Sequence, residues 1–135
     1  MSQKINNYNW SITSRVEIDT NISNLWEIIS SPSNLDLYHP FCLKNQVIHW
    51  SKEKSIDRII YLNGKIFERK FFNWIPNTGY DLKINQINKS DSLVKWRIYS
   101  VKDKSEIEIK VYPYIFNQGN VILNILPFTI ISKPL

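Results

Sequence analysis

The chain has 135 residues and a mass of 16.1 kDa, which is enough for one domain with a buried core. Apolar residues make up 43% of it and three residues are glycine, so collagen-like and low-complexity proteins are excluded. No run of about 18 apolar residues is free of charge, and we expect no integral membrane segment. The net charge of +5 is spread over single lysines along the chain, which argues against a nucleic-acid partner.

The residue usage also bears on compartment and on secondary structure. Cys42 is the single cysteine, so no internal disulfide can form. Residues 1–10 have neither the apolar core nor the cleavage site of a secretory signal, and we expect a cytoplasmic protein. Alanine, the best helix former, is absent, while the β-branched isoleucine is the most abundant residue, which favours strands.

The first third of the chain predicts one strand and two helices. Apolar and polar residues alternate over residues 11–18, which is typical of a strand. Apolar residues then recur at helical spacing over residues 22–29, with Asp19 or Thr20 as the expected cap. A second, short helix is expected over residues 34–38, because Pro40 disfavours helical geometry at the residue before it.

From residue 45 onward the apolar period changes to two, which predicts six consecutive strands in an antiparallel meander. Short segments of turn-forming residues separate them, and Asn63-Gly64 predicts a two-residue type I′ hairpin turn. The expected strands are 45–50, 56–62, 65–74, 80–87, 93–101 and 105–112.

The alternation also predicts which side chains face the inside of the sheet. The expected inward sets are Val94, Trp96 and Ile98, then Ile107, Ile109 and Val111, and then Tyr80, Leu82, Ile84 and Gln86. Strand 65–74 leaves two alternatives open. Either Phe67, Arg69 and Phe71 face inward, or their neighbours from Ile66 to Trp74 do, with Arg69 in a salt bridge on the outer face.

This order of elements predicts an α+β fold in which a curved antiparallel sheet of about seven strands is wrapped around a helix. One short helix cannot fill such a sheet, so we expect a cavity or groove between them. The sequence has no internal repeat and no linker, and residues 1–135 are expected to form a single domain.

Three segments resemble the START/Bet v 1-like superfamily, also called SRPBCC or polyketide cyclase/dehydrase-like proteins. Residues 15–29 look like its first strand running into a Val-Trp-x-x-Leu helix. Residues 35–40 (Leu-Asp-Leu-Tyr-His-Pro) resemble its Leu-x-x-Trp-x-Pro segment, and residues 61–69 with 74–76 and 80–84 resemble its Asn-Gly…Glu-Arg…Asp-Pro…Tyr hairpin. The resemblance covers about residues 11–112 and implies the helix-grip fold.

The C-terminal part departs from the family, which closes its groove with a long helix. After Pro113 the one capped helical candidate spans residues 120–126, and Pro127 limits its extension. We therefore expect the C-terminal helix to be short or missing, and two alternatives stay open: a reduced helix, or a domain truncated at this helix. The apolar tail, residues 128–131, is expected to be covered by a partner or by a second copy in a homodimer.

Residues for catalysis or for a metal or cofactor are sparse. His39 and Cys42 are three residues apart but lack a second pair of ligands, so no metal site is expected. Cys42 between Phe41 and Leu43 is interpreted as a small apolar residue rather than a nucleophile activated by His39 or His49. There is no Gly-x-Ser-x-Gly motif and no glycine-rich phosphate loop, so no cofactor is expected.

The favoured function is therefore binding of a hydrophobic small molecule, lipid-like or polyketide-like, in the groove. Two alternatives stay open. The resemblance implies an aromatase/cyclase, in which groove-lining Arg, Tyr and Trp side chains steer a polyketide, and the open groove also suits a non-catalytic protein-interaction domain. The candidate ligand-binding residues are Trp26, Tyr38, His39, Phe67, Arg69, Tyr80 and Trp96.

Overall fold

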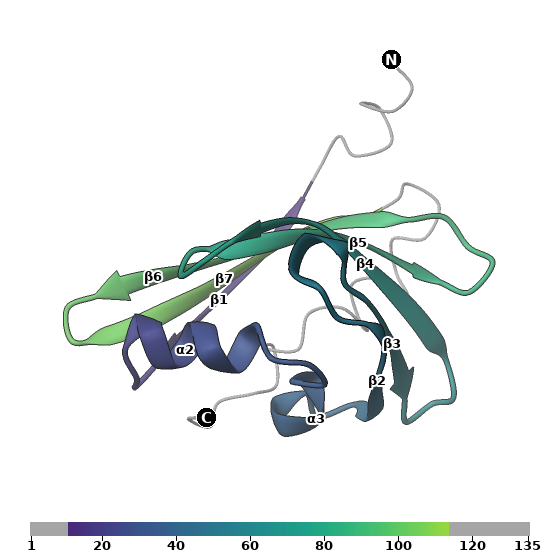
Figure 1. Cartoon of the computed structure of the whole chain (residues 1–135), viewed down its shortest axis with the longest axis horizontal. Coiled ribbons are helices and arrows are strands. Elements are labelled where there is room, and N and C mark those ends of the chain that lie inside the picture. The colour runs from purple at the N-terminus through teal and green to yellow at the C-terminus, as the bar shows by residue number, and fades with distance from the viewer. Residues whose placement is uncertain (1–10, 114–135) are drawn as a thin grey trace, which may run out of the picture.

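The computed structural model of the chain describes residues 11–113, which form a curved seven-stranded antiparallel sheet with two helices on its concave side (Figure 1). This is the α+β helix-grip architecture expected from the sequence. The elements in chain order are β1 (Ile12–Ile18), α2 (Ile22–Ile29), α3 (Leu35–Tyr38), β2 (Cys42–His49), η1 (Lys52–Lys54), β3 (Ile56–Tyr61), β4 (Ile66–Ile75), β5 (Gly79–Gln86), β6 (Ser92–Val101) and β7 (Lys104–Tyr112).

The strand order in the sheet is β1-β7-β6-β5-β4-β3-β2. Strands β2 to β7 each pair with their neighbour in sequence, as a meander requires. β1 returns to pair with β7 from Ile12 opposite Val111 to Ile18 opposite Ser105. The connection from β1 through α2 and α3 to β2 therefore crosses the concave side from one edge of the sheet to the other.

The start of β2 differs most from its prediction, because the strand begins at Cys42 rather than at residue 45. Its pairing with β3 shifts register between Cys42 and Lys44 and again between Val47 and His49. These irregularities interrupt the two-residue alternation that the prediction depended on. The 3₁₀ turn η1 between β2 and β3 was also not predicted.

Helix α2 is held at both ends by side chains. Its N-cap is Asn21, whose Oδ1 accepts a hydrogen bond from Asn24 N at 2.8 Å, so the expected cap at Asp19 or Thr20 is wrong. At the other end the Ser30 hydroxyl donates to Trp26 O and the Ser31 hydroxyl donates to Ile28 O. These two carbonyl oxygens also accept from Ser30 N and Ser31 N, so the hydroxyls add a second hydrogen bond to each in the last turn.

The turn between β3 and β4 corrects a second prediction. Gly64 has a φ of 85°, whereas Asn63 does not have a positive φ, so the turn is not type I′. Gly64 N donates to Tyr61 O at 2.9 Å, and Tyr61 N donates to Lys65 O at 2.9 Å. This is the three-residue loop with a glycine bulge, and it sets the register of the whole hairpin.

The inward side chains of β5, β6 and β7 are buried as expected, apart from Gln86, which is half-buried. On β4 the first alternative is correct, because Phe67, Arg69 and Phe71 are buried while Ile66 and Phe72 are exposed. Each buried large apolar side chain contributes about 1.5–3 kcal/mol to folding. The concave face of the sheet is therefore the core of the described part of the chain.

The expected C-terminal helix at residues 120–126 and the apolar tail at 128–131 lie outside the described residues. Within residues 11–113 no helix is long and apolar enough to cross a membrane.

Candidate functional site

An ion pair between Arg69 and Asp57 lies on the concave face of the sheet. The two residues are directly opposite each other on β4 and β3, and their side chains are 3% and 0% exposed. Arg69 Nε donates to Asp57 Oδ1 at 2.8 Å, and Nη2 donates to Oδ2 at 2.6 Å. This two-point geometry is the strong form of an arginine–carboxylate pair. Arg69 therefore faces inward, not outward.

The charge of Arg69 is permanent. Burial lowers the pKa of its guanidinium, but the negative charge and the hydrogen bonds of Asp57 raise that pKa by more, and the net direction is upward. Since both partners are charged and excluded from water, removing one of them would leave an uncompensated charge in the core.

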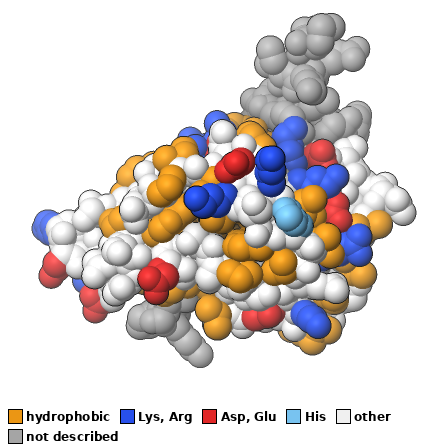
Figure 2. Space-filling model, viewed as in Figure 1, with side chains coloured by type: hydrophobic (Ala, Val, Ile, Leu, Met, Phe, Trp, Pro, Cys, Tyr) orange, Lys and Arg blue, Asp and Glu red, His pale blue; other side chains and the backbone are white. Residues whose placement is uncertain are grey.

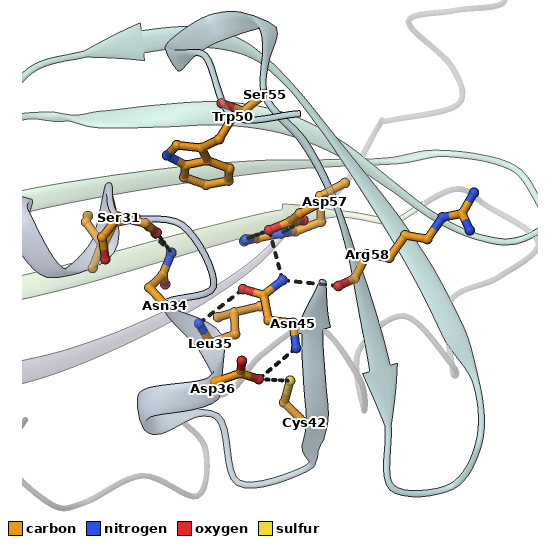
Figure 3. A network of polar contacts seen from close by, with 12 residues as sticks. Ser31, Asn34, Leu35, Asp36, Cys42, Asn45, Trp50, Ser55, Asp57 and Arg58 are labelled. Atoms are coloured by element: carbon orange, nitrogen blue, oxygen red, sulfur yellow. Dashed lines mark hydrogen bonds and ion pairs between the residues drawn. The ribbon is translucent and has the colours of Figure 1, made fainter. Parts of the chain in front are cut away.

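A hydrogen-bond network joins the ion pair to helix α3 and the edge strand β2 (Figure 3). Asn45 on β2 donates from Nδ2 to Asp57 Oδ2 at 2.9 Å and to Arg58 O at 3.1 Å. Its Oδ1 accepts from Leu35 N at 3.2 Å. The amide of Asn45 thus connects the first residue of α3 to Asp57, and it is itself 1% exposed.

Asp36 provides a second connection between α3 and β2. One of its carboxylate oxygens accepts from Asn45 N at 2.7 Å and lies 3.7 Å from Cys42 Sγ. Burial and this carboxylate raise the pKa of Cys42 to about 12, so the thiol is neutral and a poor nucleophile. Within residues 11–113 no group of three or more His, Cys, Asp and Glu side chains is placed to hold a metal ion.

Three tyrosine hydroxyls lie within electrostatic reach of Arg69. Burial raises the pKa of Tyr38, Tyr61 and Tyr80, and the positive charge of Arg69 offsets part of each increase. The Tyr38 hydroxyl donates to Asn34 Oδ1 at 2.5 Å. The three phenols are therefore neutral hydrogen-bonding groups around one cation.

The end of α2 is fixed to this region by side chains from the rest of the chain. The Tyr80 hydroxyl donates to Ile29 O at 2.9 Å, and Asn34 Nδ2 donates to the same oxygen at 3.1 Å. Trp50 Nε1 donates to Ser30 O at 3.2 Å. These contacts hold α2 against the concave face.

A pocket lies between α3 and the inner face of strands β3 to β6. Its volume is about 10 Å³, which is the space of about one water molecule. Its polar lining residues are His39, Tyr61 and Arg69. Its apolar lining residues are Leu35, Ile59, Leu82, Ile84, Val94 and Trp96.

Aromatic side chains extend from this pocket toward α2. The ring of Tyr80 lies 5.5 Å from that of Trp96 and stacks on Trp74 at 5.3 Å. Trp74 in turn contacts Trp26 of α2 edge-on at 5.6 Å and Trp50 at 5.8 Å. Trp26, Trp50 and Trp74 are half-buried, so this aromatic wall is accessible in part.

Three of the seven sequence-predicted ligand-binding residues, His39, Arg69 and Trp96, line the pocket. Tyr80 and Trp26 belong to the adjoining aromatic wall.

The other two predicted residues do not line the pocket. Tyr38 packs against the core from α3. Phe67 packs against Tyr61 with ring centroids 5.3 Å apart.

The sequence prediction missed Asp57, Asn45, Tyr61 and Leu35. Asp57 and Tyr61 lie on the hairpin strand whose inner face was not assigned. Asn45 and Leu35 enter the site through the packing of α3 on an irregular strand, for which the sequence carries no periodic signal.

Large apolar side chains are exposed on the elements next to the pocket. Leu37 on α3, Leu43 on β2 and Leu62 in the β3–β4 turn are 71%, 64% and 61% exposed. Leu62 N donates to Phe41 O at 2.9 Å, which joins the turn to the segment between α3 and β2. Figure 2 shows hydrophobic side chains exposed over the middle of the face in view, with both basic and acidic side chains around them.

Comparison with known proteins identifies the fold. No family model matches the sequence. No curated protein matches it either. Among solved structures, the protein CV1439 from Chromobacterium violaceum matches with 10% identity and a TM-score of 0.70, covering 87% of this chain and 90% of its own.

Two further structures are a protein of a biosynthetic locus and an aromatase/cyclase. DynU16, a protein of the dynemicin biosynthetic locus, matches with 10% identity and a TM-score of 0.67, covering 84% of this chain. The chain spans 40% of the length of DynU16. The Zhui aromatase/cyclase from a Streptomyces species matches with 8% identity and a TM-score of 0.65, covering 76% of this chain and 66% of its own. The chain therefore has the helix-grip fold, in common with these structures.

Proposed function

We propose that the protein binds a hydrophobic small molecule on the concave face of the sheet, at the pocket beside helix α3 and along the adjoining aromatic side chains of α2 and the sheet. The observation that carries the proposal is the pocket, in which six apolar side chains surround three polar ones. Small-molecule sites commonly combine apolar walls with a few polar groups that orient the ligand. In this proposal His39 and Arg69 orient the ligand, and Trp96, Tyr80 and Trp26 contact its apolar body.

The size of the pocket adds a requirement to the proposal. A space of about 10 Å³ accepts one oxygen atom of a ligand, whereas pockets for drug-sized molecules have about 300–1,000 Å³. The body of the ligand therefore enters when α3 moves away from the sheet. α3 is a single turn of four residues, attached to β2 through Asn45 and Asp36. Entry thus breaks a small number of hydrogen bonds.

The experiment combines native mass spectrometry of the purified protein with titration of Nile red, a neutral apolar dye. We expect a co-purified small molecule or saturable dye binding with one site. Val94→Leu adds a methylene to the pocket wall and should weaken dye binding about tenfold. Val101→Leu makes the same change on β6 outside the pocket and should leave binding unchanged.

No co-purified molecule together with non-saturable dye binding would contradict the proposal, as would equal effects of the two valine variants. The aromatase/cyclase and protein-interaction alternatives stay predictions. A clean monomer in solution would weigh against the second of them.

A further inference from the structure

We propose that the groove selects ligands whose buried polar group is uncharged, such as a ketone or a hydroxyl, over ligands that carry a carboxylate. This inference rests on the proposed function, because it names the ligand class of the same site. An arginine in a ligand site can bind either an acidic group or a carbonyl group, so the sequence alone leaves both ligand classes open for Arg69. The inference selects the carbonyl or hydroxyl class.

The argument begins with the charge of the pocket. Among the nine lining residues, Arg69 is the one with a permanent charge, and Asp57 already compensates it. The pair is neutral as a unit, with both side chains almost fully excluded from water. A ligand carboxylate would add a third charge without a cation to balance it, next to a buried carboxylate of the same sign.

The hydrogen bonds of Asp57 also oppose its displacement from Arg69 by a ligand carboxylate. Its Oδ1 accepts from Arg69 Nε, and its Oδ2 accepts from both Arg69 Nη2 and Asn45 Nδ2. Three hydrogen bonds thus fix the carboxylate on the concave face. A ligand anion would have to displace it from a site that is 0% exposed, where the released charge has no access to water.

A neutral oxygen meets no such penalty. A guanidinium has five N–H donors, of which Arg69 uses two on Asp57, and Arg69 lines the pocket. The space of about one water molecule matches a single carbonyl or hydroxyl oxygen. The site therefore offers hydrogen-bond donors without a net positive charge.

The test is displacement of Nile red from the intact protein at about pH 8 by ligands with the same chain and different polar groups. Dodecan-2-one and dodecan-1-ol carry neutral oxygens, and dodecanoate carries a charge. We expect the neutral ligands to bind at least about tenfold more tightly than dodecanoate. Equal or tighter binding of dodecanoate would overturn the inference and leave the proposed function standing. Displacement by none of the three would refute both.

A charge-changing variant adds a second test. Asp57→Asn keeps the shape of the side chain and leaves the positive charge of Arg69 uncompensated. The affinity for dodecanoate should therefore rise at least about tenfold relative to the affinity for dodecan-2-one. Asp81→Asn makes the same change in the Arg97–Asp81 pair, which lies outside the pocket lining, and should leave the preference unchanged. An unchanged preference in folded Asp57→Asn would overturn the inference. Should this variant fail to fold, the wild-type comparison decides.

Discussion

Replacement of Arg69 by methionine is expected to destabilise the fold strongly. The substitution keeps a long side chain in the core but leaves the Asp57 carboxylate at 0% exposure without its cation. Breaking a buried ion pair from one side costs about 3–5 kcal/mol. With a urea dependence of about 1–3 kcal/mol per M, the unfolding midpoint should fall by about 2 M. The assay is urea denaturation followed by tryptophan fluorescence and far-ultraviolet circular dichroism.

The control uses the same substitution on the neighbouring strand. Arg58 pairs with Glu68 on the outer face of the hairpin at 3.2 Å, and its side chain is 45% exposed. Exposed pairs contribute about 0–1 kcal/mol, so Arg58→Met should lower the midpoint little. The double variant Asp57→Asn/Arg69→Met removes both charges and should recover at least half of the stability lost in Arg69→Met. Equal losses in Arg58→Met and Arg69→Met would refute the reasoning.

Three further predictions concern backbone and side-chain chemistry. Gly79→Ala should lower the free energy of unfolding by at least about 2 kcal/mol, because φ is 153° and a Cβ would lie 1.9 Å from Trp96 O. Gly64→Ala, with open space around the added Cβ, should lower it by about 1 kcal/mol. Equal shifts of the thermal unfolding midpoint in the two variants would contradict this difference. The pKa of Cys42 is raised to about 12, so its thiol should react with Ellman's reagent at about pH 8 at least a hundredfold more slowly than free cysteine. A rate comparable to that of free cysteine would refute the burial of Cys42 beside a carboxylate. Burial raises the pKa of Tyr61 and Tyr80 above the ordinary value of 10.0, so their neutral forms stabilise the fold below about pH 10. This stability should be lost as the pH rises further, which urea denaturation at increasing pH would measure. A free energy of unfolding that stays constant over this pH range would contradict the burial of the two phenols.

The hairpin around Gly64 explains why the ion pair could not be predicted from the sequence. A two-residue type I′ loop would place Arg69 opposite Arg58 and Asp57 opposite Lys70. The three-residue loop with a glycine bulge moves the register by one residue and brings Asp57 opposite Arg69. A one-residue difference in a turn thus decides which charges meet in the core.

The fold itself was predictable because it depends on redundant signals. The apolar alternation on β6 and β7 predicts their inner faces correctly, since each strand carries several apolar side chains on one side. The pocket depends instead on single contacts. Leu35 N bonds to Asn45 on a strand with two register shifts, and no periodic pattern encodes that contact.

The measurement that tests the central claim most directly is a nuclear magnetic resonance titration of the methyl-labelled protein with dodecan-2-one. The account predicts saturable shifts and intermolecular nuclear Overhauser effects at Leu35, Ile84 and Val94, which line the pocket. Shifts confined to the exposed side chains of Leu43 and Leu62, or no saturable shifts, would contradict it.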